Sequence, residues 1–352
     1  MANVTYLIGA GASAGKRGDN GYIIEGLPCV NEISSSFRDI CNLIDKTPIP
    51  DYVEKWEDTQ LELNSKADWD NARKKLLLSF QRLLVHSERH ATIDTYAKKL
   101  VLKNNQIEFK QLEQLLTLFF IFLQVQNSPD SRYDTFLANI LESNLHFPLN
   151  IRVLSWNYDS QFELAYSGYD TVNELLVGYK NAMFDMDYEI IKINGTATFS
   201  NQENISKLRK EIWNRIWEIS EDTRGSIQLQ RDQAWLVEFV YLYQLYVYGR
   251  TNNTHLSFAF DNTCPSNKIM TSIDNIIRRT DALVIIGYTF PFFNRKIDRQ
   301  ILQGLEDGVK IYIQDPYPER IRQSLKAVLP DVIDENITTL SQVDQFFLPP
   351  EL

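Results

Sequence analysis

The residues most able to do chemistry in this 352-residue chain lie in five short polar segments. The segments are Gly9-Ala-Gly-Ala-Ser13, Trp156-Asn-Tyr-Asp159, Asn194-Gly-Thr196, Gly287-Tyr-Thr289 and Gln314-Asp-Pro316. Each follows a short apolar run, and few of these residues would serve as packing residues. Ligands of open α/β sheets bind beyond the carboxyl ends of the strands. The five segments therefore predict a site for a polar ligand.

The first segment is marked by its glycines. The chain has only 14 glycines, about half the usual share, yet five of them fall within the first 21 residues, namely Gly9, Gly11, Gly15, Gly18 and Gly21. Glycines let a backbone approach a pyrophosphate closely, and the amides at a helix N-terminus then face its charge. A tight strand-to-helix turn that binds nothing is the open alternative.

Two familiar phosphate motifs fit this segment only in part. The spacing Gly9-x-Gly11-x-x-Ala14 matches a permissive dinucleotide fingerprint. The second strand and the acidic residue expected about 20 positions later are replaced by a polar loop and a helix. A P-loop is excluded, because Ala10 and Arg17 stand where that motif needs glycine and serine or threonine.

Strands and helices alternate around these segments. Short apolar runs predict strands at residues 3–8, 150–155, 189–193, 281–286 and 310–313, with 255–260 as a further candidate. Helical spacing predicts helices at 31–45, with Asn31 as a possible cap, and at about 294–306 and 317–328. The expected fold is α/β, a Rossmann-like, mostly parallel sheet with helices on both faces.

Two helical insertions interrupt this alternation. Leucines and aromatic residues recur at threes and fours between 49 and 147, which predicts a helical subdomain whose aromatic stripes form a core. A second helical stretch is expected at about 203–250. The predicted domains are therefore a ligand-binding core of residues 1–48 and 148–352 and an insertion subdomain of residues 49–147.

Composition excludes several classes of protein. With 36 Lys and Arg against 46 Asp and Glu, the net charge is −10, which argues against broad nucleic-acid binding. Three scattered cysteines do not make a zinc ribbon, and the carboxylates Asp185 and Asp187 fit a solvated turn better than a metal site. The longest apolar run, Leu115 to Leu123, is about half a membrane span. We expect a cytoplasmic protein without a metal or membrane contact.

Taken in order, the five segments resemble the motifs of SIR2-like proteins, which have the sirtuin fold. The matching pieces include Lys192-Ile-Asn-Gly195 and Gly287-Tyr-Thr-Phe-Pro291. Longer phrases at Ser155 to Glu163, Thr92 to Leu100 and Ile286 to Asn294 look like bacterial SIR2-like proteins of anti-phage defence. The resemblance covers roughly 1–45, 150–200 and 280–330.

The resemblance implies a pocket for NAD⁺. Gly9, Ala10, Gly11 and Ser13 would line the pyrophosphate, Gly287 and Thr289 would meet the phosphate or the adenosine ribose, and Asp315 would accept hydrogen bonds from that ribose. Asn157 and Asp159 would face the nicotinamide and its ribose. An Asx turn after the strand is the alternative for these last two residues.

One position departs from the family. The catalytic histidine of SIR2-like proteins precedes a glycine, and here that position is Asn194. The four histidines, His86, His90, His146 and His255, lie elsewhere in the sequence. Protein deacylation needs this base and a zinc module, so it is not expected. Cleavage of the nicotinamide–ribose bond depends less on a base than deacylation does, because nicotinamide leaves as a neutral molecule.

The expected function is therefore an SIR2-like NAD⁺ glycohydrolase that depletes NAD⁺ during phage infection, with Asn157, Asp159 and Asn194 as catalytic residues. The alternative is a sensor or scaffold that binds NAD⁺ or an ADP-ribose-type nucleotide without turnover, and a weaker one is ADP-ribosyl transfer. The resemblance further implies control by oligomerisation or by a partner such as a HerA-type ATPase.

Overall fold

The fold was analysed in a computed structural model of the chain. It describes residues 2–19, 21–51, 53, 61–143, 145–169, 175–178, 188–199, 210–211, 227–248, 253–261 and 265–352, with the backbone alone for 227–231. The predicted turn with Asp185 and Asp187, most of the expected helical stretch before residue 227, and Cys264 lie outside the described residues.

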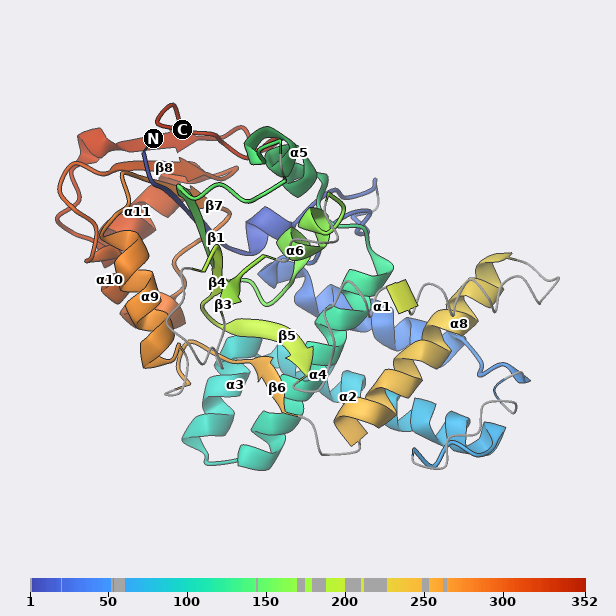
Figure 1. The fold of residues 1–352 in the computed structure, drawn as a ribbon. Helices are drawn as coiled ribbons and strands as arrows, with labels where there is room; N and C mark the ends of the chain where they lie inside the picture. The colour runs from blue at the N-terminus through green and yellow to red at the C-terminus, as the bar shows by residue number, and fades with distance from the viewer. Residues whose placement is uncertain are drawn as a thin grey trace. The chain divides into compact units, whose positions relative to one another are not determined.

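Seven strands of the described residues form one sheet, in the order β3-β4-β2-β1-β7-β8-β9 (Figure 1). Every pairing between these strands is parallel. Their bounds are β1 Val4–Ile8, β2 Ile151–Ser155, β3 Val177–Gly178, β4 Ile190–Lys192, β7 Ala282–Ile286, β8 Lys310–Gln314 and β9 Ile337–Leu340. The five strands predicted from sequence are thus confirmed, and the short strands β3 and β9 were not foreseen.

The strand order is that of a doubly wound, Rossmann-like sheet. Without the edge strand β3, the order of the six remaining strands runs 3-2-1-4-5-6 along the chain, and the order reverses between β1 and β7. The second strand that the dinucleotide fingerprint requires is therefore present. It is β2, which pairs with β1 but follows only after the helical insertion.

Helices cover both faces of the sheet, as expected. On one face lie α9 Asn267–Ile277, α10 Arg295–Leu302 and α11 Pro318–Val328, which share a core with the strand side chains that point that way (Figure 1). On the other lie α5 Ser131–Ile140 and α6 Gln161–Tyr166. Because side chains alternate along each strand, β1 contributes Leu7 to the first core and Tyr6 to the second.

The helical insertions form a second compact unit. It holds α1 Ile33–Lys46, α2 Lys66–Arg89, α3 Ile93–Leu102, α4 Gln106–Gln126, α8 Ile227–Leu242 and the π-helical segment η4 Tyr243–Tyr248. Its core is aromatic, with Phe37 4.7 Å from Phe119 and Phe122 stacked 4.2 Å from Phe239, measured between ring centroids. The aromatic stripes are therefore core packing.

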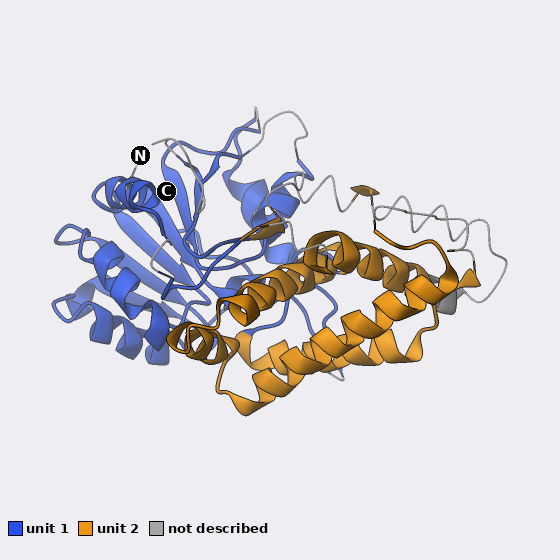
Figure 2. Cartoon of the chain, turned by 90° about the horizontal axis from the view of Figure 1, so that it is seen from below, with its two compact units in different colours: residues 1–29, 127–196, 255–352 blue, residues 30–126, 197–254 orange. Residues whose placement is uncertain are grey.

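The chain divides into unit 1, residues 1–29, 127–196 and 255–352, and unit 2, residues 30–126 and 197–254 (Figure 2). The sequence prediction placed the borders at 48 and 148. They differ because α1 packs its Phe37 on the helical core, whereas α5 packs Phe136 against Tyr6 of the sheet, with ring centroids 4.9 Å apart.

Smaller differences from the prediction concern element ends. Glu32, not Asn31, is the residue before α1, after a 3-10 turn η2 Val30–Glu32. Gly195 begins a strand, β5 Gly195–Phe199, which pairs with β6 Thr254–Leu256 in a two-stranded sheet of the described residues. The remaining short 3-10 segments are η1 Ala10–Ser13, η5 Phe292–Asn294 and η6 Asp334–Asn336.

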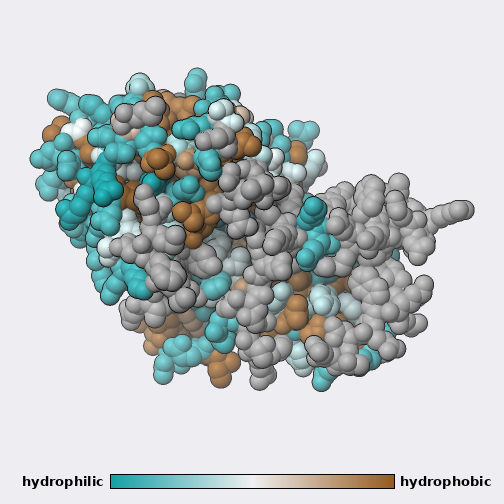
Figure 3. Space-filling model, viewed as in Figure 1, coloured by the Kyte–Doolittle hydropathy of each residue, from teal (hydrophilic) through white to brown (hydrophobic). Residues whose placement is uncertain are grey.

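Apolar residues at the surface lie in separate patches among hydrophilic ones on the face shown in Figure 3. Among the described helices, none combines the length and the apolar character that crossing a membrane requires. Even α4, whose residues from Gln114 to Val125 are all buried, packs within unit 2.

Candidate functional site

The carboxyl ends of β1, β2, β4, β7 and β8 bring the predicted segments to one edge of the sheet. Register fixes this, since Ile8 at the end of β1 pairs with Ser155 of β2 and with Ile286 of β7. Ser155 pairs with Lys192 of β4, and Ile286 with Gln314 of β8. The β1 segment therefore lies in the middle of the edge, at the point where the strand order reverses.

The glycines of the β1 segment pack against the β7 segment. Gly9 and Gly11 donate their amide hydrogens to Ile286 O and Gly287 O, each at 3.0 Å. A Cβ atom on Gly9 would lie 2.7 Å from Gly287 O, and one on Gly11 would lie 2.7 Å from Gly287 Cα. The sequence predicted that these glycines approach a pyrophosphate. In this structure they allow the β1 and β7 segments to pack closely.

Ala10 and Ser13 begin and end the 3-10 turn η1, which follows directly. Ala10 is half-buried, whereas Ser13 is buried, and the Ser13 hydroxyl joins several polar groups. It lies 3.0 Å from the Tyr133 hydroxyl and donates to Asp159 Oδ1 at 3.1 Å. Ser13 thus connects β1, α5 and the segment after β2.

Asn157 holds the glycine segment from the β2 side. Its Nδ2 donates to Gly9 O at 2.9 Å and to Ser13 Oγ at 3.1 Å, and the residue is only 7% exposed. These bonds do not form the Asx turn considered for Asn157, because both go to residues that follow β1.

Asp159 makes the Asx turn and also reaches the β1 segment. Its Oδ1 accepts the Gln161 amide hydrogen, two residues on, at 3.1 Å, together with the Ser13 hydroxyl. Burial raises the pKa of Asp159 above its ordinary value, and the ammonium of Lys192 opposes that rise most strongly. A carboxyl group tuned in this direction is suited to accept a proton from water.

Two charged residues without an assigned role complete this side of the site. The Lys192 side chain is 1% exposed, and its Nζ lies 3.0 Å from Glu163 Oε1. The same ammonium donates to the main-chain oxygen of Asp159. Burial raises the pKa of Glu163, and Lys192 counteracts it. Sequence reasoning quoted Lys192 only as part of a motif, and its contacts depend on a strand pairing that no local pattern reveals.

Asn194 stands just beyond β4 and is 6% exposed. Its main-chain oxygen accepts two hydrogen bonds from Ser257, from the amide and from the hydroxyl, each at 2.9 Å. Its side-chain Oδ1 is buried and receives no hydrogen bond from the described residues. A buried acceptor in this condition is rare and suits a ligand that brings a donor, such as a ribose hydroxyl or a carboxamide.

One histidine comes closer to Asn194 than its sequence position suggests. His255 lies on β6, and its carbonyl oxygen faces Gly195, which adopts a φ of +74°. His86 and His90 instead contact Tyr96 inside unit 2, where His86 stacks on Tyr96 with 4.0 Å between ring centroids and His90 lies tilted against it.

The β7 and β8 segments are more exposed. Gly287 has a φ of +58° and contacts Gly11 and Ala12, whereas Thr289 is exposed. Asp315 is half-buried, and its Oδ1 accepts the Tyr317 amide hydrogen at 2.8 Å in an Asx turn before α11. The structure brings Thr289 and Asp315 to the same edge as Asn157 but shows no contact that joins them to it.

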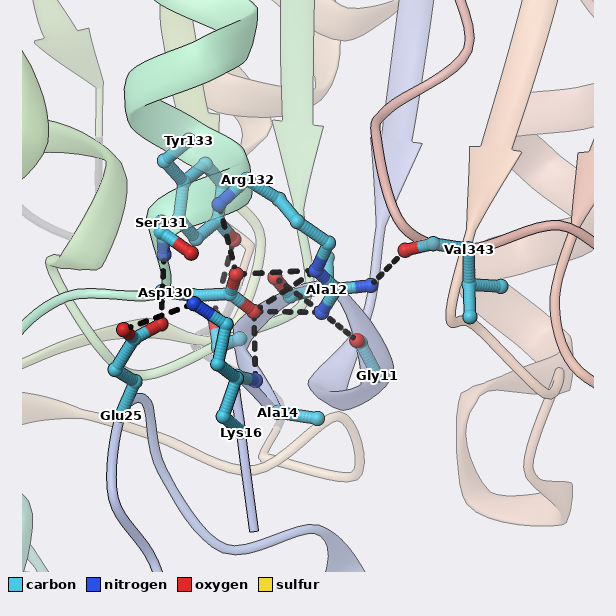
Figure 4. Close-up of polar contacts among 12 residues, drawn as sticks. Gly11, Ala12, Ala14, Lys16, Glu25, Asp130, Ser131, Arg132, Tyr133 and Val343 are labelled. Atoms are coloured by element: carbon cyan, nitrogen blue, oxygen red, sulfur yellow. Dashed lines mark hydrogen bonds and ion pairs between the residues drawn. The ribbon is translucent and has the colours of Figure 1, made fainter.

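An aspartate–arginine pair that sequence reasoning missed braces the β1 segment (Figure 4). Asp130 is 1% exposed, its Oδ2 accepts the Gly15 amide hydrogen at 2.6 Å, and both of its oxygens bind the Arg132 guanidinium. Arg132 also donates to Gly11 O at 2.9 Å and Val343 O at 3.1 Å. The contacts of this pair with Gly11, Gly15 and Val343 link residues more than a hundred positions apart, so no spacing pattern could have indicated them.

Residues 15–19 and 21–26 form a hairpin-like loop. Arg17 and Ile23 form an antiparallel bridge, and the Leu27 amide returns to Ser13 O at 2.8 Å. Gly15 and Gly26 have φ angles of +62° and +79°, and a side chain at either would overlap the other arm. The glycine concentration at the N-terminus thus serves loop closure as well as the site.

Comparison with models of known protein families gives no match for this chain, and comparison with curated proteins gives none either. Within the described residues, no group of three or more histidine, cysteine, aspartate or glutamate side chains is arranged to hold a metal ion. The function of the chain is therefore inferred from the site itself.

Proposed function

We propose that the chain is an SIR2-like NAD⁺ glycohydrolase of the cytoplasm that depletes NAD⁺ in anti-phage defence. The observation that carries the proposal is the hydrogen-bonded assembly of Ser13, Asn157 and Asp159 beside the reversal point of a doubly wound sheet, with Asn194 following β4 on the same edge. Dinucleotides bind at this point in Rossmann-like folds. The five motif segments follow the SIR2-like order, which favours NAD⁺ among dinucleotides.

The reaction would join NAD⁺ and water to give nicotinamide, ADP-ribose and a proton. The bond between ribose C1′ and the pyridinium nitrogen breaks, its electron pair stays with the ring, and the water oxygen bonds to C1′. The developing charge on the sugar is positive, so a nearby carboxylate stabilises the transition state. Asp159 would supply this field and take the proton that water loses, a task for which its raised pKa suits it.

The remaining residues would orient the substrate. Asn157 holds Gly9 O and Ser13, and so sets the shape of the segment that would meet the pyrophosphate. Asn194 would offer its free Oδ1 to a donor on the nicotinamide riboside half. Gly287, Thr289 and Asp315 would take the adenosine half.

The sensor is the second candidate, and a specific observation favours it. Asn157, Asp159 and Ser13 are all buried and hydrogen-bonded to one another, so each is already engaged before any ligand arrives. With Asn194 in place of the family's histidine, such a site could hold a nucleotide without turning it over.

Incubation of the purified protein with NAD⁺, with and without phage lysate, separates the two candidates. Free nicotinamide is followed by chromatography in wild type, Asp159→Asn and the control Asp307→Asn, which makes the same change at an exposed turn before β8. An asparagine can still accept from Ser13 and Gln161, so Asp159→Asn removes charge with little change of structure. We expect turnover in wild type and in the control, and a loss of about 10²-fold or more in Asp159→Asn.

Saturable NAD⁺ binding without release of nicotinamide would replace the hydrolase with the sensor. Equal turnover in Asp159→Asn and wild type would show that the residue assignment is wrong. A free NAD⁺ hydrolase would harm its host, so the proposal includes control by self-assembly or by a HerA-type ATPase. That part is checked by comparing turnover across protein concentrations and with the ATPase added.

A further inference from the structure

The ion pair of Lys192 and Glu163 is a deeply buried charged contact at the site edge. The two side chains are 1% and 17% exposed, with 3.0 Å between Nζ and Oε1. Removing two charges from water usually costs more free energy than their mutual attraction contributes, so apolar residues of the same size often stabilise a fold equally well. The pair therefore calls for an explanation other than stability.

Its geometry ties two neighbouring elements to one residue. Lys192 ends β4, whereas Asp159 and Glu163 lie four positions apart across the start of α6. The ammonium donates to Asp159 O and pairs with Glu163, so one cation from the adjacent strand holds both ends of this turn. With its main chain held in this way, Asp159 directs its carboxyl group to Ser13 of η1.

We propose that Lys192 and Glu163 are positioning residues, which hold Asp159 in place at the end of β2 and set the electrostatic field at its carboxyl group. This inference rests on the proposed NAD⁺ hydrolysis, because it assigns the pair to the residue that acts there. Neither side chain is assigned contact with the substrate.

The charge balance supports an electrostatic role. Two carboxyl groups, those of Asp159 and Glu163, share the single ammonium of Lys192. Burial raises the pKa of both groups and the Lys192 charge lowers it, whereas the Asp159 charge raises the pKa of Glu163. Tyr133 of α5 faces the same cluster through Ser13, and the Asp159 charge raises the pKa of its hydroxyl. Glu163 Oε2 is buried and receives no hydrogen bond from the described residues, which costs free energy and is not expected of a contact made only for stability.

Steady-state NAD⁺ hydrolysis measured from pH 5 to 9 tests the proposal with Lys192→Met, Lys192→Arg and Glu163→Gln. Loss of the ammonium in Lys192→Met should raise the pKa of Asp159, so the acid limb of the kcat profile moves up by about one pH unit and kcat falls while KM changes little. Glu163→Gln leaves the Lys192 ammonium to interact with the Asp159 carboxylate alone, so the acid limb should move to lower pH. Lys192→Arg should restore most of the wild-type profile. Lys310→Met, at the exposed start of β8, serves as the control and should change nothing.

Opposite displacements in Lys192→Met and Glu163→Gln support the proposal, because a merely structural pair would lower activity in both without moving either limb. Unmoved limbs in an active wild type would overturn it and leave the hydrolase proposal intact. If Lys192→Met does not fold, Glu163→Gln decides alone. If wild type binds NAD⁺ but releases no nicotinamide, the hydrolase fails, and the same opposite displacements are then sought in the pH profile of NAD⁺ affinity. A wild type that binds no NAD⁺ overturns both.

Discussion

The edge that carries the candidate site has two unlike halves. On the side of β2 and β4, Asn157, Asp159 and Lys192 are buried. Ser13 links Asn157 to Asp159 by hydrogen bonds, and Lys192 donates to Asp159 O and forms an ion pair with Glu163. On the side of β7 and β8, Thr289 is exposed and Asp315 half-buried, and the Asp315 carboxylate accepts a local hydrogen bond, from the Tyr317 amide. Both halves flank the same glycine segment.

This difference separates two tasks. Electrostatic effects are strongest where water is excluded, so the buried half is suited to act on a reacting centre. An exposed half with few internal bonds is suited to hold a ligand and let it go. The substitution that most disturbs folding should therefore fall in the buried half, and those in the exposed half should change ligand affinity more than stability.

The largest effect on stability is expected from a substitution at Gly195, beside Asn194. Its φ of +74° lies in the left-handed region, and a Cβ there would overlap the carbonyl oxygen of His255. Because both the backbone conformation and a backbone contact oppose it, Gly195→Ala should lower the free energy of unfolding by about 3 kcal/mol or more. Urea denaturation followed by circular dichroism measures this.

Gly308 offers a matched control for that variant. It too has a positive φ, +91°, but no atom lies within 4 Å of the position that its Cβ would take. Gly308→Ala should therefore cost only about 1 kcal/mol, the conformational part. Equal losses in the two variants would mean that contact with His255 does not constrain the buried half.

The second largest effect on stability concerns the buried contacts of Tyr288, next to the exposed half. Tyr288, which follows Gly287, stacks on Trp156 with 5.6 Å between ring centroids and donates to both oxygens of Asp298, at 2.8 and 2.9 Å. Burial raises the pKa of Asp298 to about 8. Between its ordinary pKa and that value, the folded chain keeps a proton that the unfolded chain has released.

Stability should consequently fall as pH rises from about 4 to 8 and stop changing on this account above 8. The slope from one proton is at most about 1.4 kcal/mol per pH unit. Asp298→Asn removes this contribution, so the stability of the variant relative to wild type should increase as pH rises through this range. Urea denaturation at several pH values checks this, and parallel pH profiles for the two proteins would contradict it.

The sequence predicted the sheet better than it predicted the site. Five strands were evident because parallel strands buried on both faces are short apolar runs, and the polar segments follow them directly. β3 has only two residues, and β9, Ile-Thr-Thr-Leu, is too short and too polar to stand out. The topology could not be deduced, since a helical unit separates β1 from its partner β2.

At the site, the sequence indicated which residues gather but not what they contact. Ser13, Asn157 and Asp159 were expected to face a ligand, and the structure shows them bonded to one another. The roles of Asp130 and Arg132 were invisible, because Arg132 meets Gly11 across 121 positions. Such contacts depend on tertiary packing, which leaves no periodic signal in the chain.

The smallest effect on stability is expected in the exposed half, at Asp315. Asp315→Ala removes the acceptor of the Tyr317 amide hydrogen and should cost about 1 kcal/mol in unfolding free energy. If the carboxylate also accepts ribose hydroxyls, the affinity for ADP-ribose should fall about tenfold, as measured by calorimetry. Asp315→Asn keeps an acceptor for Tyr317, so it should regain stability without regaining full affinity. Wild-type affinity in both variants would confine ligand recognition to the buried half, and the β8 segment would then be a helix-initiating turn only.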